Sequence, residues 1–357
     1  MSIPDHRTGV SRRAIGQIAL GTILAGGLAA VPQPEGTHAS IPEDAAWTEI
    51  PATDNVPSGR WDHTVGSLDS EKGLLVFGGR NADGMSLGDT WMFSRSRNIW
   101  EVIDTEGPSP RFGHATAVDQ EANIVYLFGG QHGAEFYNDL WAFSGQTQRW
   151  TLIDDGSASA PVPRYGTSLA ISGDGVLIVS HGFTFEGRFD DTWAFTIESG
   201  SWENITPVDI RPLNRCLHEA VWSLEESRML LFGGCSSGYG PCPQGDFWSF
   251  DPERRTWELV SPGTAPAARS NPSLAMDSGR NQLLLFGGLT EAGHSAELWS
   301  TDRTRGNSNS WSQTASSARW PSPRSSHDLV VAGPRVWLFG GLGDQGPLND
   351  LWYLDLK

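Results

Sequence analysis

Six arginines recur along the chain at intervals of about 50 residues, and their spacing gives the first indication of chemistry. They stand at Arg60, Arg111, Arg164, Arg215, Arg269 and Arg324. A guanidinium presents a rigid fork of donors that pairs with a carboxylate or a phosphate. If the fold gathers six such groups at one place, they would focus a local positive potential there.

The residue after each arginine divides the six copies into two halves. It is aromatic in the first three copies (Trp61, Phe112 and Tyr165) and is Cys216, Ser270 or Ser325 in the others. Further aromatic residues follow in the second, third and fourth copies, among them Phe136, Phe183, Phe185 and Tyr239. We expect an aromatic crescent beside the guanidiniums, which suits a sugar face, an aromatic ligand or a peptide. The structural alternative is that the aromatic rings pack on neighbouring loops, while an aspartate of a nearby Asp-Leu-Trp motif neutralises each arginine.

Histidine and cysteine offer less chemistry than arginine. Four histidines recur with the arginines, which favours a structural role: His63, His114, His218 and His327. Three more occur singly and are predicted to be exposed: His132, His181 and His294. No pair has the spacing of a zinc site, so we expect no metal and no cofactor. Cys235 and Cys242 bracket one short segment and are predicted to form a disulfide in an exported protein, leaving Cys216 free.

Composition restricts the partner and the fold class. The chain of 357 residues has 25 basic and 42 acidic side chains and a formal net charge of −17. This balance argues against nucleic acid as a partner, because phosphate binding needs a basic face. The 42 glycines, 22 prolines and 16 tryptophans indicate turn-rich β structure and exclude an all-α fold.

A repeat of about 52 residues positions the arginines. Each copy begins with an apolar run that ends in a double glycine. A loop follows, then Asp-Leu-Trp or a variant of it, and then a further tryptophan. The double glycines are Gly78-Gly79, Gly129-Gly130, Gly233-Gly234, Gly287-Gly288 and Gly340-Gly341, and His181-Gly182 takes their place in the third copy. This repeated sequence pattern resembles the Kelch repeat. The resemblance implies a six-bladed β-propeller with four strands per blade, in which most tryptophans pack between blades.

The two ends of the repeat region predict how the ring closes. The last copy stops after Leu351-Trp352-Tyr353-Leu354 without a fourth strand. Trp47-Thr48-Glu49-Ile50, ahead of the first copy, matches Trp100-Glu101-Val102-Ile103 at the fourth-strand position. We therefore expect the N-terminal strand to complete the sixth blade and to leave no free edge.

The first 39 residues have the layout of a signal peptide. Arg12 and Arg13 precede a Gly- and Ala-rich apolar run that ends near Val31, which is similar to a twin-arginine leader; a general secretory leader remains open. Cleavage is predicted after Ala39 or Ala29. The mature chain, residues 40–357, would be a single exported domain, periplasmic or extracellular, monomeric and without a membrane span.

Two functions remain open at this stage. The resemblance implies that a ligand binds at the mouth of the central channel, where arginines at this position hold an anionic substrate or an acidic peptide. The first function is therefore a binding scaffold for a peptide, a protein or a glycan, with the arginines and Trp61, Phe112 and Tyr165 as ligand-binding residues. The second is a metal-independent carbohydrate-modifying enzyme similar to the periplasmic sialic-acid epimerases (mutarotases), which would use Arg111, Arg164 and Glu186. An enzyme needs titratable groups that converge on one pocket. The sequence shows aromatic and arginine side chains that could anchor a ligand more clearly than it shows titratable groups that meet in one pocket. This favours the scaffold over the enzyme.

Overall fold

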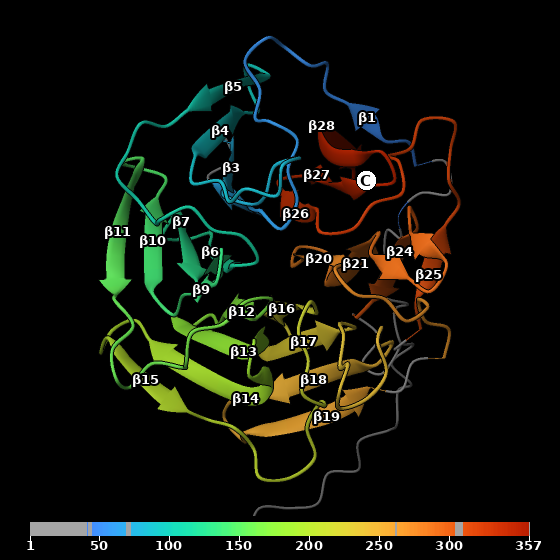
Figure 1. The fold of residues 1–357 in the computed structure, drawn as a ribbon. Coiled ribbons are helices and arrows are strands. Elements are labelled where there is room, and N and C mark those ends of the chain that lie inside the picture. The colour runs from blue at the N-terminus through green and yellow to red at the C-terminus, as the bar shows by residue number, and fades with distance from the viewer. Residues whose placement is uncertain (1–40, 42–44, 69–72, 261–262, 304–309, 357) are drawn as a thin grey trace, which may run out of the picture. The chain divides into compact units, whose positions relative to one another are not determined.

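The computed structural model describes Ile41 and residues 45–68, 73–260, 263–303 and 310–356, which form six four-stranded antiparallel sheets around a common axis (Figure 1). From the inner to the outer strand, blade 1 contains β2 (Thr64–Leu68), β3 (Gly73–Phe77), β4 (Thr90–Ser94) and β5 (Ile99–Val102). Blade 2 contains β6 (Ala115–Asp119), β7 (Ile124–Phe128), β10 (Leu140–Ser144) and β11 (Arg149–Asp154). Blade 3 contains β12 (Ser168–Ile171), β13 (Val176–Thr184), β14 (Gly187–Thr196) and β15 (Ser201–Asn204).

The remaining blades follow the same order. Blade 4 contains β16 (Glu219–Ser223), β17 (Arg228–Phe232), β18 (Phe247–Asp251) and β19 (Thr256–Val260). Blade 5 contains β20 (Ser273–Asp277), β21 (Gln282–Phe286), β24 (Leu298–Asp302) and β25 (Ser312–Thr314). Blade 6 contains β26 (Asp328–Ala332), β27 (Arg335–Gly343), β28 (Gly346–Asp355) and β1 (Thr48–Glu49). Two small hairpins extend the loops of blades 2 and 5: β8 (Gln131–His132) with β9 (Glu135–Phe136), and β22 (Leu289–Thr290) with β23 (Gly293–His294).

The six-bladed propeller confirms the predicted fold class, including its closure. The N-terminal β1 pairs antiparallel with β28 through Thr48 opposite Tyr353 and Glu49 opposite Trp352. Trp47 is 1% exposed and packs edge-on against Phe286 of blade 5. The strand therefore fills the fourth position of blade 6, as the repeat of Trp47-Thr48-Glu49-Ile50 predicts. The proposed leader lies outside the described residues and stays a prediction.

The core lies between blades, because each apolar second strand is buried on both faces. One cluster joins Leu75 and Phe77 of blade 1 to Leu127, Phe143 and Trp150 of blade 2, and five equivalent clusters join the other neighbouring blades. The tryptophans of the outer strands are buried in these clusters, as expected for packing residues. Among the described residues, no helix is long and apolar enough to cross a membrane.

The double glycine ends the second strand of a blade and lets another backbone approach closely. Gly79 has φ 96°, and a Cβ there would lie 2.8 Å from the Trp61 carbonyl oxygen. In blade 3, His181 takes the first glycine position with φ 58°. Its side chain is 0% exposed, so the prediction that His181 is exposed was wrong. Strand β13 passes through this position and directs the imidazole ring of His181 into the core.

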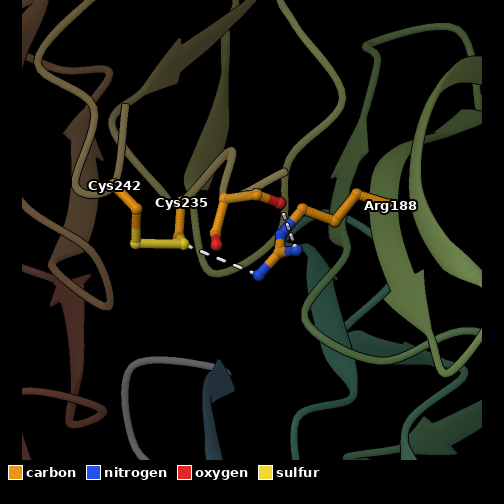
Figure 2. The surroundings of a disulfide bond; sticks show 4 residues. Arg188, Cys235 and Cys242 are labelled. Carbon is orange, nitrogen blue, oxygen red and sulfur yellow. Dashed lines mark hydrogen bonds between the residues drawn. A yellow bond between two sulfur atoms is a disulfide. The ribbon is translucent and has the colours of Figure 1, made fainter. Parts of the chain in front are cut away.

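The loops that follow the second strands, together with the six arginines, lie on one face of the propeller, which we call the loop face. The loop between β17 and β18 contains a disulfide between Cys235 and Cys242 (Figure 2). Cys216, on the neighbouring inner segment, is a buried free thiol. Arg188 reaches this loop from blade 3: its Nη1 donates to the Ser237 carbonyl at 2.7 Å, and its Nη2 lies 3.6 Å from Cys235 Sγ. The loop is thereby held at both its base and its side.

Candidate functional site

A closed ring of backbone hydrogen bonds surrounds the channel on the loop face. It is formed by the residue two positions after each arginine: Asp62, Gly113, Gly166, Leu217, Asn271 and Ser326. Each has a φ between 49° and 61°, and each N–H donates to the carbonyl oxygen of its counterpart in the preceding blade at 2.8 to 3.1 Å. The ring fixes all six arginine segments at the same height around the channel.

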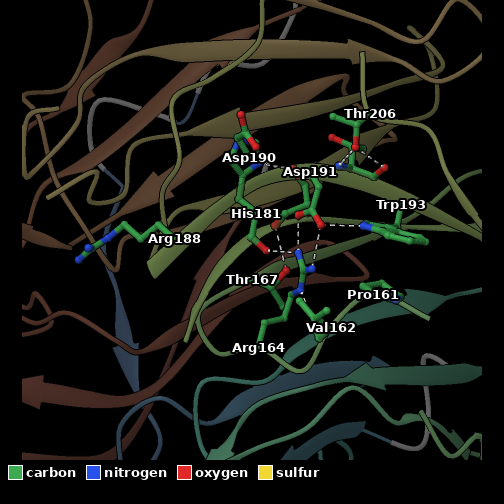
Figure 3. A network of polar contacts seen from close by, with 12 residues as sticks. Pro161, Val162, Arg164, Thr167, His181, Arg188, Asp190, Asp191, Trp193 and Thr206 are labelled. Atoms are coloured by element: carbon green, nitrogen blue, oxygen red, sulfur yellow. Dashed lines mark hydrogen bonds and ion pairs between the residues drawn. The ribbon is translucent and has the colours of Figure 1, made fainter. Parts of the chain in front are cut away.

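The arginines point into their own blades, and Arg164 shows how (Figure 3). Its Nη1 and Nη2 donate to the two carboxylate oxygens of Asp191 at 2.6 and 2.9 Å. Nη1 also donates to the His181 carbonyl at 2.9 Å, and Nε donates to the Val162 carbonyl at 3.0 Å. Asp191 accepts a further bond from Trp193 Nε1 at 2.8 Å. Four of the five guanidinium N–H donors are therefore engaged within the protein.

The same arrangement recurs in every blade. Asp89, Asp139, Asp191, Asp246 and Asp350 pair with their arginines through both carboxylate oxygens, and Glu297 pairs with Arg269 through one. Burial raises the pKa of Asp191, but the hydrogen bonds and charge of Arg164 outweigh burial and bring the pKa below its ordinary value. The Arg164–Asp191 pair is therefore charged at neutral pH.

These pairs correct the expectation of a ligand-binding arginine ring. Arg60, Arg111, Arg164, Arg215, Arg269 and Arg324 are each no more than 1% exposed. Their charges are neutralised by the carboxylates beside them, so they present neither a donor fork nor a positive potential to a ligand. The structure places them in the structural role that the sequence left open as the alternative.

The aromatic residues beside the arginines form a cluster across blades 1 to 3. The Arg80 guanidinium lies 3.9 Å from the Phe112 ring centroid and 5.4 Å from that of Trp61, and it pairs with Asp62 at 2.6 Å. Phe112 meets Tyr165 edge-to-face with centroids 5.6 Å apart. Burial raises the pKa of Tyr165 well above its ordinary value.

This clustering corrects part of the predicted aromatic crescent. Phe112 is only 6% exposed, whereas Trp61 and Tyr165 are half-buried. Phe112 therefore serves as packing for Arg80 and Tyr165. Sequence reasoning did not identify Arg80, which fills the space between the rings.

A second group of apolar side chains lies farther out on the loop face. We call it the outer patch and define it as Phe136, Phe183, Phe185, Leu213 and Tyr239. Phe185 is 68% exposed and meets Phe136 edge-to-face at 4.9 Å. Tyr239 is 52% exposed, and its hydroxyl lies beside Gly187, 3.0 Å from the place where a Cβ would stand. Leu213, 46% exposed, lies against Gly240.

The patch spans three blades. Blade 2 supplies Phe136 from the β8–β9 hairpin, blade 3 supplies Phe183 and Phe185, and the disulfide-bearing loop supplies Tyr239. The four aromatic members are among the residues that the sequence places in the crescent. Leu213 was missed, because only the fold brings the loop between blades 3 and 4 against Gly240.

Five acidic residues line a cavity of about 470 Å³ inside the channel, and two of them, Glu219 and Asp328, have strongly raised pKa values. Asp328 accepts from the Val65 amide at 2.6 Å and from the Ser273 hydroxyl at 3.3 Å, and burial raises its pKa to about 7. Burial and the nearby Asp328 raise the pKa of Glu219 well above its ordinary value. Sequence reasoning missed both, although the equivalent positions hold Thr64, Ala115, Ser168 and Ser273 and the two acids interrupt that pattern.

The repeated histidines are buried and uncharged. Burial lowers the pKa of His63 and of His218 to about 3. His63 packs edge-on against Phe339 of the preceding blade at 5.3 Å. Within the part of the chain that the structure describes, no three His, Cys, Asp or Glu side chains come together in a group that could hold a metal ion.

Comparison with known proteins agrees with this architecture. A family model described as the KLHDC2/KLHL20/DRC7 Kelch-repeats domain matches residues 20–234 and 222–357. Similar proteins include the flagellar outer-arm dynein alpha chain of Chlamydomonas reinhardtii, 28% identical over 70% of this chain and 6% of the dynein. An F-box/kelch-repeat protein of Arabidopsis thaliana is 27% identical over 54% of this chain and 46% of its own length. Human Kelch domain-containing protein 3 is 25% identical over 68% of this chain and 67% of its own length. The chain thus covers less than two thirds of the first two relatives.

Proposed function

This chain belongs to the Kelch-repeat family of β-propellers, and from that premise we propose that it is a scaffold that binds a protein partner through the outer patch. Propellers of this family are typical protein-interaction scaffolds. The rigid ring holds the loops, and the loops of blades 2 to 4 present the apolar contact surface. A peptide segment of the partner would lie across Phe185 and Tyr239.

The exposure of Phe185 is the observation that carries this proposal. A phenylalanine that is 68% exposed at a loop tip leaves apolar area in contact with water, which binding would remove. Phe136 and Phe183 support the ring from below, so it is presented in a defined position. An aromatic anchor of this kind typically contributes about 2 kcal/mol or more to binding.

Export is part of the same proposal. Arg12 and Arg13, followed by an apolar Gly- and Ala-rich run, support a leader that directs the chain to the periplasm or the cell exterior. The disulfide between Cys235 and Cys242 fits an oxidising compartment. Secretion of a fusion of residues 1–39 to a reporter enzyme, lost on changing Arg12 and Arg13 to Lys, would support the twin-arginine route.

The carbohydrate-modifying alternative loses its main support in the structure. Its arginines, Arg111 and Arg164, are held in buried ion pairs, and Glu186 lies at an exposed loop tip. These three residues offer no common pocket to a sugar. We therefore expect the full chain to leave the rate of interconversion of sialic-acid anomers unchanged.

A peptide-array experiment tests the scaffold. The full chain is applied to arrays of designed peptides in parallel with Phe185→Ser and with Leu224→Ser, which removes an exposed leucine from the opposite face. We expect Phe185→Ser to weaken binding at least ~10-fold at an unchanged melting temperature, since ~1.4 kcal/mol is one decade. Equal binding by the wild type and Phe185→Ser would refute the outer patch as the site, and a loss confined to Leu224→Ser would move the site to the opposite face.

A further inference from the structure

Exposed carboxylates stand at the loop tips around the loop face. Five of the six blades carry one between their second and third strands: Asp83, Glu135, Glu186, Glu291 and Asp344. All five side chains are exposed, and none forms an ion pair with another described residue. Asp209, which follows Val208 in the loop between blades 3 and 4, is exposed as well. The face is therefore acidic at its rim.

The arginines beside the outer patch are already engaged. Arg188 donates to the Ser237 carbonyl, and Arg211 pairs with Asp190 at 2.8 Å. The six ring arginines are buried in their own pairs. Arg188 keeps its positive charge, because the Ser237 carbonyl is neutral, but Glu135, Glu186 and Asp209 on the same face outnumber it. The excess of negative charge reverses the expectation of a positive potential at this face.

We propose that the occupant of the outer patch is a cationic polypeptide segment with an apolar side chain at its centre. The apolar side chain would seat on Phe185 and Tyr239. Lysine or arginine residues on either side would reach Glu135, Glu186 and Asp209. This inference rests on the proposed function and adds the chemistry of the partner.

Binding that depends on charge should weaken as the salt concentration rises, and binding through apolar contact alone should not. Rim charges act mainly on the association rate and are screened as ionic strength rises. Removing the three carboxylates should therefore weaken binding and also abolish most of its salt dependence. Removing Phe185 should weaken binding and leave the salt dependence of the remaining binding in place.

The test uses fluorescence anisotropy with the full chain and three peptides that share one apolar centre and differ in their flanks, which are Lys/Arg, Gln or Asp/Glu. The wild type should bind the Lys/Arg peptide at least ~10-fold more tightly than the Gln peptide, and the Asp/Glu peptide least. The variant Glu135→Gln/Glu186→Gln/Asp209→Asn should lose that preference at an unchanged melting temperature. The matched control Asp83→Asn/Asp344→Asn changes loop tips of blades 1 and 6 and should keep the preference.

The outcomes separate the two proposals. If all three peptides bind equally and Phe185→Ser weakens each of them, the outer patch is a docking site and the cationic partner is refuted. If the Asp/Glu peptide binds most tightly, the charge argument is refuted. If no peptide binds, or if Phe185→Ser changes nothing, the proposed function itself is refuted.

Discussion

Replacing Asp191 by alanine tests whether the buried ion pairs hold the propeller together. The change removes both acceptors of the Arg164 fork and leaves a guanidinium that is 0% exposed with its charge unbalanced. Breaking a buried pair by removing one partner typically costs about 3–5 kcal/mol. With an unfolding entropy of about 2.1 cal/mol/K per residue, that cost lowers the melting temperature of a domain of this size by roughly 5–8 °C. Urea unfolding and thermal melting of the full chain measure both quantities.

The neighbouring residue provides a matched control. Asp190 pairs with Arg211, but both side chains are about one third exposed, at 32% and 31%. An exposed pair contributes about 0–1 kcal/mol, so Asp190→Ala should unfold almost as the wild type does. Replacing both partners, as in Arg164→Met/Asp191→Leu, should be milder than Asp191→Ala, because no charge is left buried. Equal losses in Asp190→Ala and Asp191→Ala would refute the reasoning.

Three further predictions concern closure, the channel and the backbone ring. Trp47→Ala should cost about 3–5 kcal/mol in urea unfolding, because the buried ring anchors the closing strand, and a loss under ~1 kcal/mol would contradict closure by β1. Asp328 has a raised pKa of about 7, so its contribution to the free energy of unfolding is full below pH ~4 and is lost as the pH rises to ~7. Asp328→Asn should therefore reduce the dependence of the free energy of unfolding on pH between these values. An unchanged pH dependence in the variant would contradict the raised pKa. Gly113→Ala places a Cβ 2.0 Å from the Tyr165 ring and should lower the melting temperature far more than Gly84→Ala does. At Gly84 the new Cβ meets no neighbouring atom, and the variant bears only the strain of a positive φ, about 1–2 kcal/mol. Similar melting temperatures of the two variants would contradict the close approach of Tyr165 to Gly113.

The fold could be predicted from the sequence because the double glycine and the tryptophans recur in register. The pairing of Trp47-Thr48-Glu49-Ile50 with the last blade followed from the same alignment. It needs only the comparison of one copy of the repeat with another, which is the information that a repeat supplies.

The site could be predicted only in part. Arg164 and Asp191 are both visible in the sequence, but their pairing depends on how a blade brings its first and third strands together. Phe112 and Phe185 look alike in sequence, yet one is covered by Arg80 and the other is exposed, and only side-chain packing decides between them. The channel acids Glu219 and Asp328 were missed because their burial depends on the whole ring.

The pairing of β1 with β28 also determines when, during synthesis, the propeller can finish folding. Thr48 and Tyr353 lie almost a whole domain apart in sequence, and contacts of such long separation form slowly because loop-closure entropy must be overcome first. During synthesis the first strand must wait until the last has left the ribosome, with Trp47 and its partners exposed in the meantime. A linear repeat array can fold from any point and grow along its length. In this ring the hydrogen bonds between β1 and β28 join the first strand of the propeller to its last, so the ring can close only after the last blade has been synthesised.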